Sequence, residues 1–168
     1  MDFCYNSVIL KYMNILSQSD IFIRILLAAA IGGAIGLERE WSHKAAGLRT
    51  HALVSIGAAL LSIISLSAFQ KGIGTAYDPS RIISNIIVGI GFIGGGAILR
   101  RGPRVHGITT AATLWVVAVL GIAIGVGFIR EALFTTGVVY FVLIILWFLE
   151  KKFAKLRAEF YDEEYPDE

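Results

Sequence analysis

Apolar residues in this chain come in long unbroken runs rather than at the spacing of a surface helix or an amphipathic strand. Five runs stand out, at residues 21–37, 52–69, 82–99, 108–129 and 132–149. A helix needs roughly 17 to 25 mainly apolar residues to cross the hydrocarbon core of a bilayer. Because lipid cannot satisfy free backbone groups, each run is expected to be a helix. The pattern predicts an all-α integral membrane protein with five transmembrane helices.

Composition supports this class and limits the domain organisation. Of the 168 residues, 56% are hydrophobic, and the five runs use most of the chain. We therefore expect a transmembrane domain over residues 1–150 and a cytoplasmic amphipathic and acidic tail over residues 151–168. The first 20 residues lack the basic start and the small-residue cleavage site of a signal peptide. They are expected to remain as an interfacial segment of the mature protein.

Lysine and arginine residues gather on one side of a five-span chain. They follow the first, third and fifth spans, whereas the other loops hold fewer of them. The three clusters contain Arg39, Lys44 and Arg49, then Arg100, Arg101 and Arg104, then Lys151, Lys152, Lys155 and Arg157. By the positive-inside rule, the N-terminus is predicted outside and the C-terminus in the cytoplasm. Arg24, at the outer end of the first span, is an exception to this bias.

Residue content argues against several functional classes. The single cysteine, Cys4, excludes an internal disulfide and a cysteine-based zinc site. A net charge of +2 is too small to suggest nucleic-acid binding. No serine–histidine–aspartate, cysteine–histidine or paired-carboxylate arrangement appears, so we expect no enzyme, no cofactor and no metal site. Glu40 and His43 have the Glu-x-x-His spacing of carboxylate-bridged metal helices, but a helical ion pair between Glu40 and Lys44 is the simpler interpretation.

The chain contains an internal repeat. The segment "GLRTHALVSIGAAL" from Gly47 aligns with "GITTAATLWVVAVL" from Gly107, matching Thr50 with Thr110. Each segment follows a glycine-rich span and a short basic loop. The sequence therefore predicts two helical hairpins of the same orientation, followed by a fifth helix.

Small residues recur four positions apart in three spans, a spacing that lets membrane helices approach closely. The sets are Ala28, Gly32 and Gly36, then Gly91 and Gly95, then Gly121 and Gly125. We interpret them as packing positions, with a pore or a broken helix at "GFIGGGAI" as the alternative. Asn85 is the most polar residue inside the third span, where an unpaired amide is costly. Two interpretations of the Asn85 side chain remain: it makes a hydrogen bond to a neighbouring helix, or it makes a functional contact.

Two separated blocks, "GLEREWSHKAAGLRTHALVSIGAAL" and "NIIVGIGFIGGGAILRRGPRVHGITTAATLWVVA", closely resemble the MgtC/SapB family of bacterial inner-membrane proteins. The likeness runs from about residue 21 to about residue 128. Positions that match the family's motifs form the candidate site, and the resemblance implies no catalytic role for any of them. They are Glu38, Arg39, Gly47, Leu48, Arg49, Thr50, Asn85, Gly89, Gly91, Phe92, Gly94, Gly107, Thr109, Thr110, Ala111 and Trp115.

The resemblance implies a regulatory protein of the inner membrane, linked to growth in low magnesium. It implies a membrane partner, with ATP synthase as the example known for some family members, and it leaves a homo-oligomer open. This chain resembles the short SapB-like form, because it stops soon after Phe160 where other members continue into a soluble domain. A small transporter or channel for a cation or another solute is the alternative function.

Overall fold

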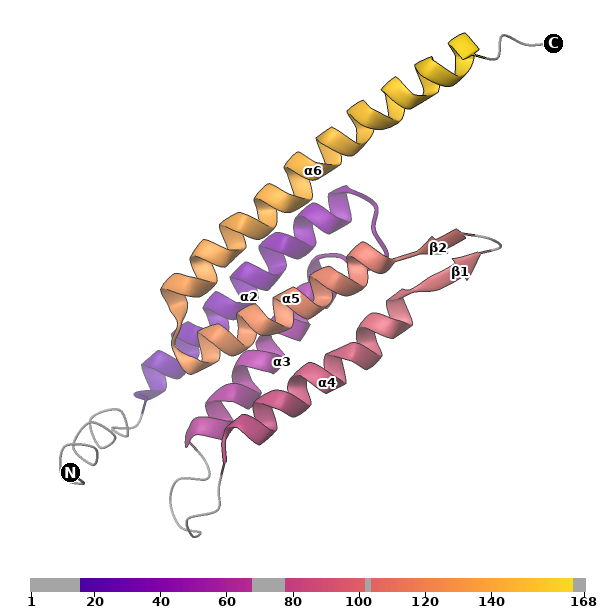
Figure 1. The fold of residues 1–168 in the computed structure, drawn as a ribbon. Coiled ribbons are helices and arrows are strands. Elements are labelled where there is room, and N and C mark those ends of the chain that lie inside the picture. Colours follow the sequence, from indigo (N-terminus) through magenta and orange to yellow (C-terminus); the bar gives the residue numbers. More distant parts are fainter. Residues whose placement is uncertain (1–15, 68–77, 102–103, 165–168) are drawn as a thin grey trace, which may run out of the picture.

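The computed structural model describes residues 16–67, 78–101 and 104–164 and is almost entirely helical there (Figure 1). Its elements, in chain order, are α2 (Gln18–Trp41), α3 (Leu48–Ser67), α4 (Ser80–Ala97), β1 (Leu99–Arg101), β2 (Arg104–His106), α5 (Ile108–Val126) and α6 (Ile129–Glu164). Among the described residues, α2, α3, α4 and α5 are each long and apolar enough to cross a membrane. The predicted fifth span lies within α6. The predicted all-α membrane architecture is confirmed, while most of the expected interfacial segment lies outside the described residues.

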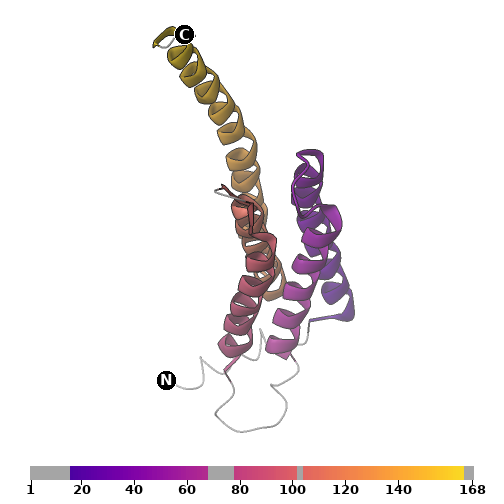
Figure 2. The same cartoon turned by 90° about the vertical axis from the view of Figure 1, so that its right-hand side faces the viewer.

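The helices form two hairpins that run in the same direction, α2–α3 and α4–α5 (Figure 1). The α2–α3 turn, the β1–β2 hairpin and the start of α5 lie at one end of the bundle, which we call the charged end. Helix α3 packs mainly against α2 and α5, and α4 packs mainly against α5. Helix α6 makes fewer contacts and extends well past the other helices (Figure 2).

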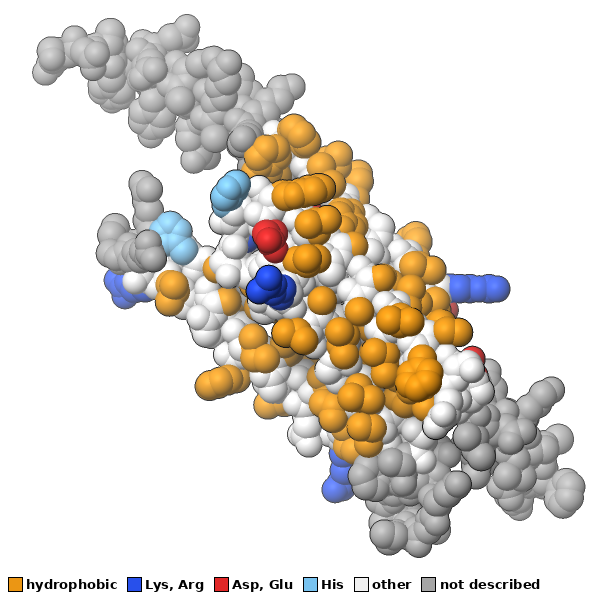
Figure 3. Space-filling model, turned by 180° about the vertical axis from the view of Figure 1, so that it is seen from behind, with side chains coloured by type: hydrophobic (Ala, Val, Ile, Leu, Met, Phe, Trp, Pro, Cys, Tyr) orange, Lys and Arg blue, Asp and Glu red, His pale blue; other side chains and the backbone are white. Residues whose placement is uncertain are grey.

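A continuous apolar core joins four of the helices. Ala28 and Ile35 of α2, Ala59 of α3 and Val117 of α5 are fully buried in it. Ala132 attaches the first turns of α6 to the same cluster. Side chains on the outside are also largely apolar, as expected for a surface in contact with lipid (Figure 3).

Close helix contacts depend on glycines in α2 and α5. A methyl group added at Gly32 would lie 2.6 Å from Ser55 Cβ and 2.7 Å from the His51 carbonyl oxygen. At Gly121 and Gly125, an added methyl group would collide with the backbone of α3. The predicted packing role of these small residues is confirmed.

The same prediction is wrong for α4. A methyl group added at Gly91 or Gly95 would meet no atom within 4 Å. Helix α4 instead contacts its neighbours through Ile90 and Gly94, which are its buried residues. The spacing of the glycines is the same as in α2, but the helix is rotated so that they face outward.

Gly107 connects the β1–β2 hairpin to α5. Its backbone is left-handed, with φ of 90°, and it is the N-cap residue of α5. An added methyl group there would collide with the carbonyl oxygen of Ala97. A residue with a side chain at this position would therefore be strained in two ways.

Arg24 holds the opposite end of the bundle together. Its guanidinium donates a hydrogen bond of 2.7 Å to the carbonyl oxygen of Gly125, in the last turn of α5. A cation at a helix C-terminus interacts favourably with unpaired carbonyls and with the helix dipole. This contact gives Arg24 a structural role, which explains its departure from the distribution of the other basic residues.

Hydrogen bonds fix the connection between the two hairpins at its C-terminal end, just before α4. The Ser65 hydroxyl donates a 2.8 Å hydrogen bond to the Pro79 carbonyl oxygen, just before α4 begins. Asp78 accepts a 2.9 Å hydrogen bond from the Ser80 N–H. Hydrogen bonding to Ser80 lowers the pKa of the Asp78 carboxyl below its usual value.

Candidate functional site

Four polar side chains are buried together near the charged end, where α2 ends and where α3 and α5 begin. Arg39 and His51 are 4% and 0% exposed, and Thr110 and Thr113 are similarly buried. Arg39 comes from the last turn of α2, and the other three come from the first turns of α3 and α5. We call these four residues together with Glu38 the polar cluster.

Arg39 pairs with its neighbour in sequence. Its guanidinium donates two hydrogen bonds to the Glu38 carboxylate, of which the Nη2–Oε1 bond is 2.6 Å. The Ser42 hydroxyl donates a third hydrogen bond to the same carboxylate at 2.8 Å. Removing one partner would leave the other charge poorly compensated in a largely buried place. These contacts join three residues at the C-terminal end of α2, so the family positions Glu38 and Arg39 pair with each other.

Glu40 has a different role from the one predicted. Its carboxylate accepts a 2.9 Å hydrogen bond from the backbone N–H of Leu48, the first residue of α3. The predicted ion pair with Lys44 is wrong, because α2 ends at Trp41 and the helical spacing does not continue to Lys44. Gly47 allows this cap, since a methyl group there would lie 2.7 Å from Glu40 Oε2.

His51 connects the two hairpins. Its Nδ1 lies 2.9 Å from the Gly47 carbonyl oxygen, and its Nε2 lies 3.1 Å from Thr113 Oγ1. Thr113 Oγ1 is also 2.9 Å from the Thr110 carbonyl oxygen. The first turns of α3 and α5 are thus joined by one chain of polar contacts, which places the two repeated segments side by side.

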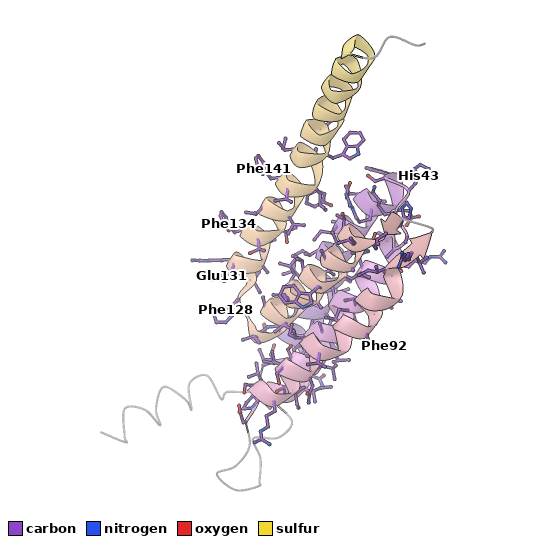
Figure 4. The ribbon with its side chains drawn as sticks, turned by 45° about the vertical axis from the view of Figure 1, so that its right-hand side comes forward. His43, Phe92, Phe128, Glu131, Phe134 and Phe141 are labelled. Atoms are coloured by element: carbon purple, nitrogen blue, oxygen red, sulfur yellow. The ribbon has the colours of Figure 1, made fainter. Side chains whose placement is uncertain are left out.

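The remaining candidates of the charged end lie on its surface. Arg49 and Thr50 are exposed on the first turn of α3, and Thr109 and Trp115 are exposed on α5. His43, in the α2–α3 turn, has a positive φ of 52° and points outward at this end (Figure 4). Within the described residues, no group of three or more His, Cys, Asp or Glu side chains could hold a metal ion.

The third-span candidates fall on the outer face of α4. Asn85, Gly89 and Phe92 follow one another at intervals of three or four residues and are exposed, and Gly96, which was not among the candidates, continues the same exposed row. Phe92 is 88% exposed and points away from the bundle (Figure 4). A methyl group added at Gly89 or Gly96 would meet nothing within 4 Å. We call these four residues the α4 face.

Asn85 makes no interhelical hydrogen bond within the described part of the chain, so that expectation is wrong for the isolated molecule. Gly94 is the exception among the α4 candidates. It is buried, and an added methyl group would make ordinary contact with Ala111 at 3.6 Å. The candidate residues therefore divide between a buried cluster and two separate surfaces.

Sequence reasoning did not single out His51 and Thr113 as a contact. The Ser62 and Thr113 hydroxyls lie within hydrogen-bond distance of carbonyl oxygens of their own helices, those of Ala58 and Thr110. Alignment of the repeats places His51 opposite Ala111, so the repeat itself gives no signal for the bond to Thr113. Ser55, one turn after His51, is buried, and its hydroxyl has no hydrogen-bond partner among the described residues.

Comparison with known proteins identifies a family and several relatives of this chain. The model of the MgtC family matches residues 25–152. The chain is 38% identical over 146 residues to "Putative magnesium transporter YhiD" of Escherichia coli (strain K12), covering 85% of this chain and 67% of that protein. It is 40% identical over 124 residues to "Protein MgtC" of Salmonella typhimurium (strain LT2), covering 74% of this chain and 51% of that protein.

A third relative is slr0014 of Synechocystis sp., which is 44% identical over 110 residues, covering 66% of this chain and 45% of that protein. The chain thus spans about half the length of the MgtC proteins that it matches. The search of solved structures finds no match. The family model covers well over half of the chain, in the region that contains the polar cluster and the α4 face, and the protein belongs to the MgtC family.

Proposed function

We propose that this protein is a regulatory protein of the bacterial inner membrane that acts on another membrane protein during adaptation to low magnesium. The N-terminus lies outside in this proposal, and the charged end faces the cytoplasm, as the distribution of lysine and arginine favours. The name of one relative, a putative magnesium transporter, supports the link to magnesium. The family resemblance points to ATP synthase as the partner.

The α4 face is the main observation that supports a membrane protein partner. Asn85 exposes an amide at the start of the part of α4 that is apolar from Ile86 onward, and lipid offers it no hydrogen-bond partner. Gly89 and Gly96 leave the backbone of the same face open to close approach. Small residues beside a polar side chain are the usual means by which membrane helices associate. A transmembrane helix of a partner would cover the glycines and satisfy the amide.

A transporter for magnesium or another cation is the second candidate, because of the name of the YhiD relative. The packing of α2, α3 and α5 opposes a route between these helices, since their backbones are in contact at Gly32 and Gly121. Magnesium is usually bound through carboxylates. The acidic residues of α2 to α5 lie near helix ends; they are Asp20, Glu38 and Glu40.

Co-reconstitution with an F-type ATP synthase in liposomes tests the proposal. The full chain is expected to reduce ATP-driven proton pumping, measured with a pH-sensitive dye, and Asn85→Ala is expected to abolish that reduction. Ser84→Ala is the matched control, because Ser84 is also exposed on α4 but its hydroxyl is satisfied by the Arg81 carbonyl at 2.9 Å. Unchanged pumping in the presence of the wild-type chain would reject ATP synthase as the partner.

A second measurement separates the two candidate functions. Liposomes that contain the protein alone and a magnesium-sensitive dye are exposed to external magnesium. A regulator gives no protein-dependent influx. Influx that Asn85→Ala abolishes would establish the transporter instead.

A further inference from the structure

The imidazole of His51 has a polar atom at each ring nitrogen and no exposed surface. The group at Nδ1 is a carbonyl, that of Gly47, which can only accept a hydrogen bond. The group at Nε2 is the Thr113 hydroxyl, which can donate or accept. Nδ1 therefore carries a proton in every arrangement that makes both contacts.

The neutral ring is fully hydrogen-bonded in this geometry. Its Nδ1–H donates to Gly47, and its Nε2 accepts the proton of the Thr113 hydroxyl. The Thr110 carbonyl then has no bond from that hydroxyl. It is not left unpaired, because a carbonyl at this place in a helix accepts the N–H four residues later.

The protonated ring is also fully hydrogen-bonded, without movement of any heavier atom. Nε2–H donates to Thr113 Oγ1, and the Thr113 hydroxyl turns its own proton to the Thr110 carbonyl, 2.9 Å away. The two states differ by one added proton and by rotation of one hydroxyl. A carbonyl at both nitrogens or an apolar neighbour would instead favour a single protonation state.

Groups near His51 act on the charge of its ring in both directions. Burial opposes the charged ring, and so does Arg39 at the end of α2, whereas Glu38 favours it. Arg39 and Glu38 are paired with each other, which offsets much of their separate effects. Lys44 in the turn and Tyr140 of α6 lie within electrostatic reach of Glu38. Helix α5 contains no charged residue, and the one in α4, Arg81, is at the opposite end of the bundle.

We infer that His51 is a buried proton-binding site and that the Thr113 hydroxyl is the positioning group that satisfies both of its protonation states. The site lies where the first turns of the two hairpins meet, so proton binding places a charge at that junction. This inference goes beyond the proposed regulatory function and does not depend on the identity of a partner.

Nitrogen-15 NMR of the histidine side chains tests it, with the full chain in lipid nanodiscs between about pH 4 and about pH 9. His43→Gln and His106→Gln assign the signals of the other two histidines. We expect His51 to pass from the neutral Nδ1–H form to the imidazolium while circular dichroism shows that the helices remain intact. A ring that keeps one form over the whole range in which the protein is folded would overturn the proposal.

Thr113 variants test the positioning role. Thr113→Val removes the hydroxyl and keeps the shape, and it should lower the midpoint of the His51 titration by about 0.5 to 1 pH unit. The reason is that the charged ring loses a stronger hydrogen bond than the neutral ring does. Thr113→Ser keeps the hydroxyl and should keep the midpoint. An unchanged or raised midpoint in Thr113→Val would reject this role, and if that variant does not fold, the wild-type titration still decides the main claim.

Discussion

The two helical hairpins share a direction and a glycine-rich first helix, but they use their glycines in opposite ways. In α2, Gly32 and Gly36 face α3 so closely that an added methyl group would overlap its backbone. In α4, Gly89 and Gly91 face open space. The first hairpin and α5 form the fixed centre of the bundle, whereas α4 presents its glycines at the surface. Glycine content alone therefore does not show whether a membrane helix is packed inside its own chain or exposed for another.

The connections of the two hairpins differ as well. The last turn of α2 contains an ion pair, and a carboxylate from the same turn caps the start of α3. The α4–α5 connection is a short antiparallel hairpin in which Leu99 pairs with His106, followed by a left-handed glycine and no side-chain cap. One connection is fixed by side chains and the other by backbone conformation. The aligned glycines Gly47 and Gly107 should therefore respond differently to the same substitution.

The largest effect is expected from Gly107→Ala. A methyl group there meets the Ala97 carbonyl oxygen and forces a left-handed backbone on alanine. We expect a loss of about 3 kcal/mol or more in the free energy of unfolding, measured by titration with sodium dodecyl sulfate in mixed micelles. Gly47→Ala is the matched variant, and it should cost about 1 kcal/mol, because its methyl group would lie closest to the Glu40 carboxylate, at 2.7 Å, which can rotate away, and otherwise 3.2 Å from Glu40 Cβ. Equal losses would show that the two connections are fixed in the same way.

A smaller effect is expected from Gly32→Ala in α2. The methyl group would lie 2.6 Å from Ser55 Cβ and would push α2 away from α3, at a cost of about 2 kcal/mol. The same change at Gly91 in α4 meets nothing within 4 Å, and it should stabilise the protein by about 0.4 to 1 kcal/mol, because alanine favours a helix more than glycine does. The same mixed-micelle titration measures both. A large loss in Gly91→Ala would mean that α4 is packed more tightly in the membrane than in the isolated chain.

Much of the fold follows from the sequence, because the hydrocarbon core requires long apolar runs and closed backbone hydrogen bonding. The predicted second span, residues 52–69, falls mainly within α3, and the third, residues 82–99, differs from α4 by two residues at each end. The repeat also predicted the parallel hairpins, because each basic loop follows a glycine-rich span. The rotation of each helix could not be predicted in this way. A helix that is apolar all round gives little indication of which side faces the protein, and this is why the role of Gly91 and Gly95 was misjudged.

The candidate site could be predicted only in part, for a related reason. Arg39 and Thr110 are both buried at the charged end, and the family motif contains both together with Glu38. The bond between His51 and Thr113 joins residues 62 positions apart, and it depends on how closely α3 and α5 approach. That approach is set by Gly121 and Gly125 on a different part of α5. The Glu40 cap likewise depends on the path of the turn rather than on helical spacing.

The smallest effect concerns the cap that only the first hairpin has. Glu40→Ala removes the acceptor for the Leu48 N–H and should cost about 1 kcal/mol, because the first turn of α3 then has one more unpaired donor. Glu131→Ala is the control, since Glu131 is an exposed acidic residue in the first turn of α6 and should contribute through the helix dipole alone, about 0.3 to 0.5 kcal/mol. Thermal unfolding in detergent, followed by circular dichroism, measures both. Glu40→Gln retains an acceptor without the charge, so its melting temperature should lie between those of the wild type and Glu40→Ala. If Glu40→Ala and Glu131→Ala melt alike, the carboxylate acts only through its charge, and the side-chain cap that distinguishes the first hairpin from the second contributes nothing to stability.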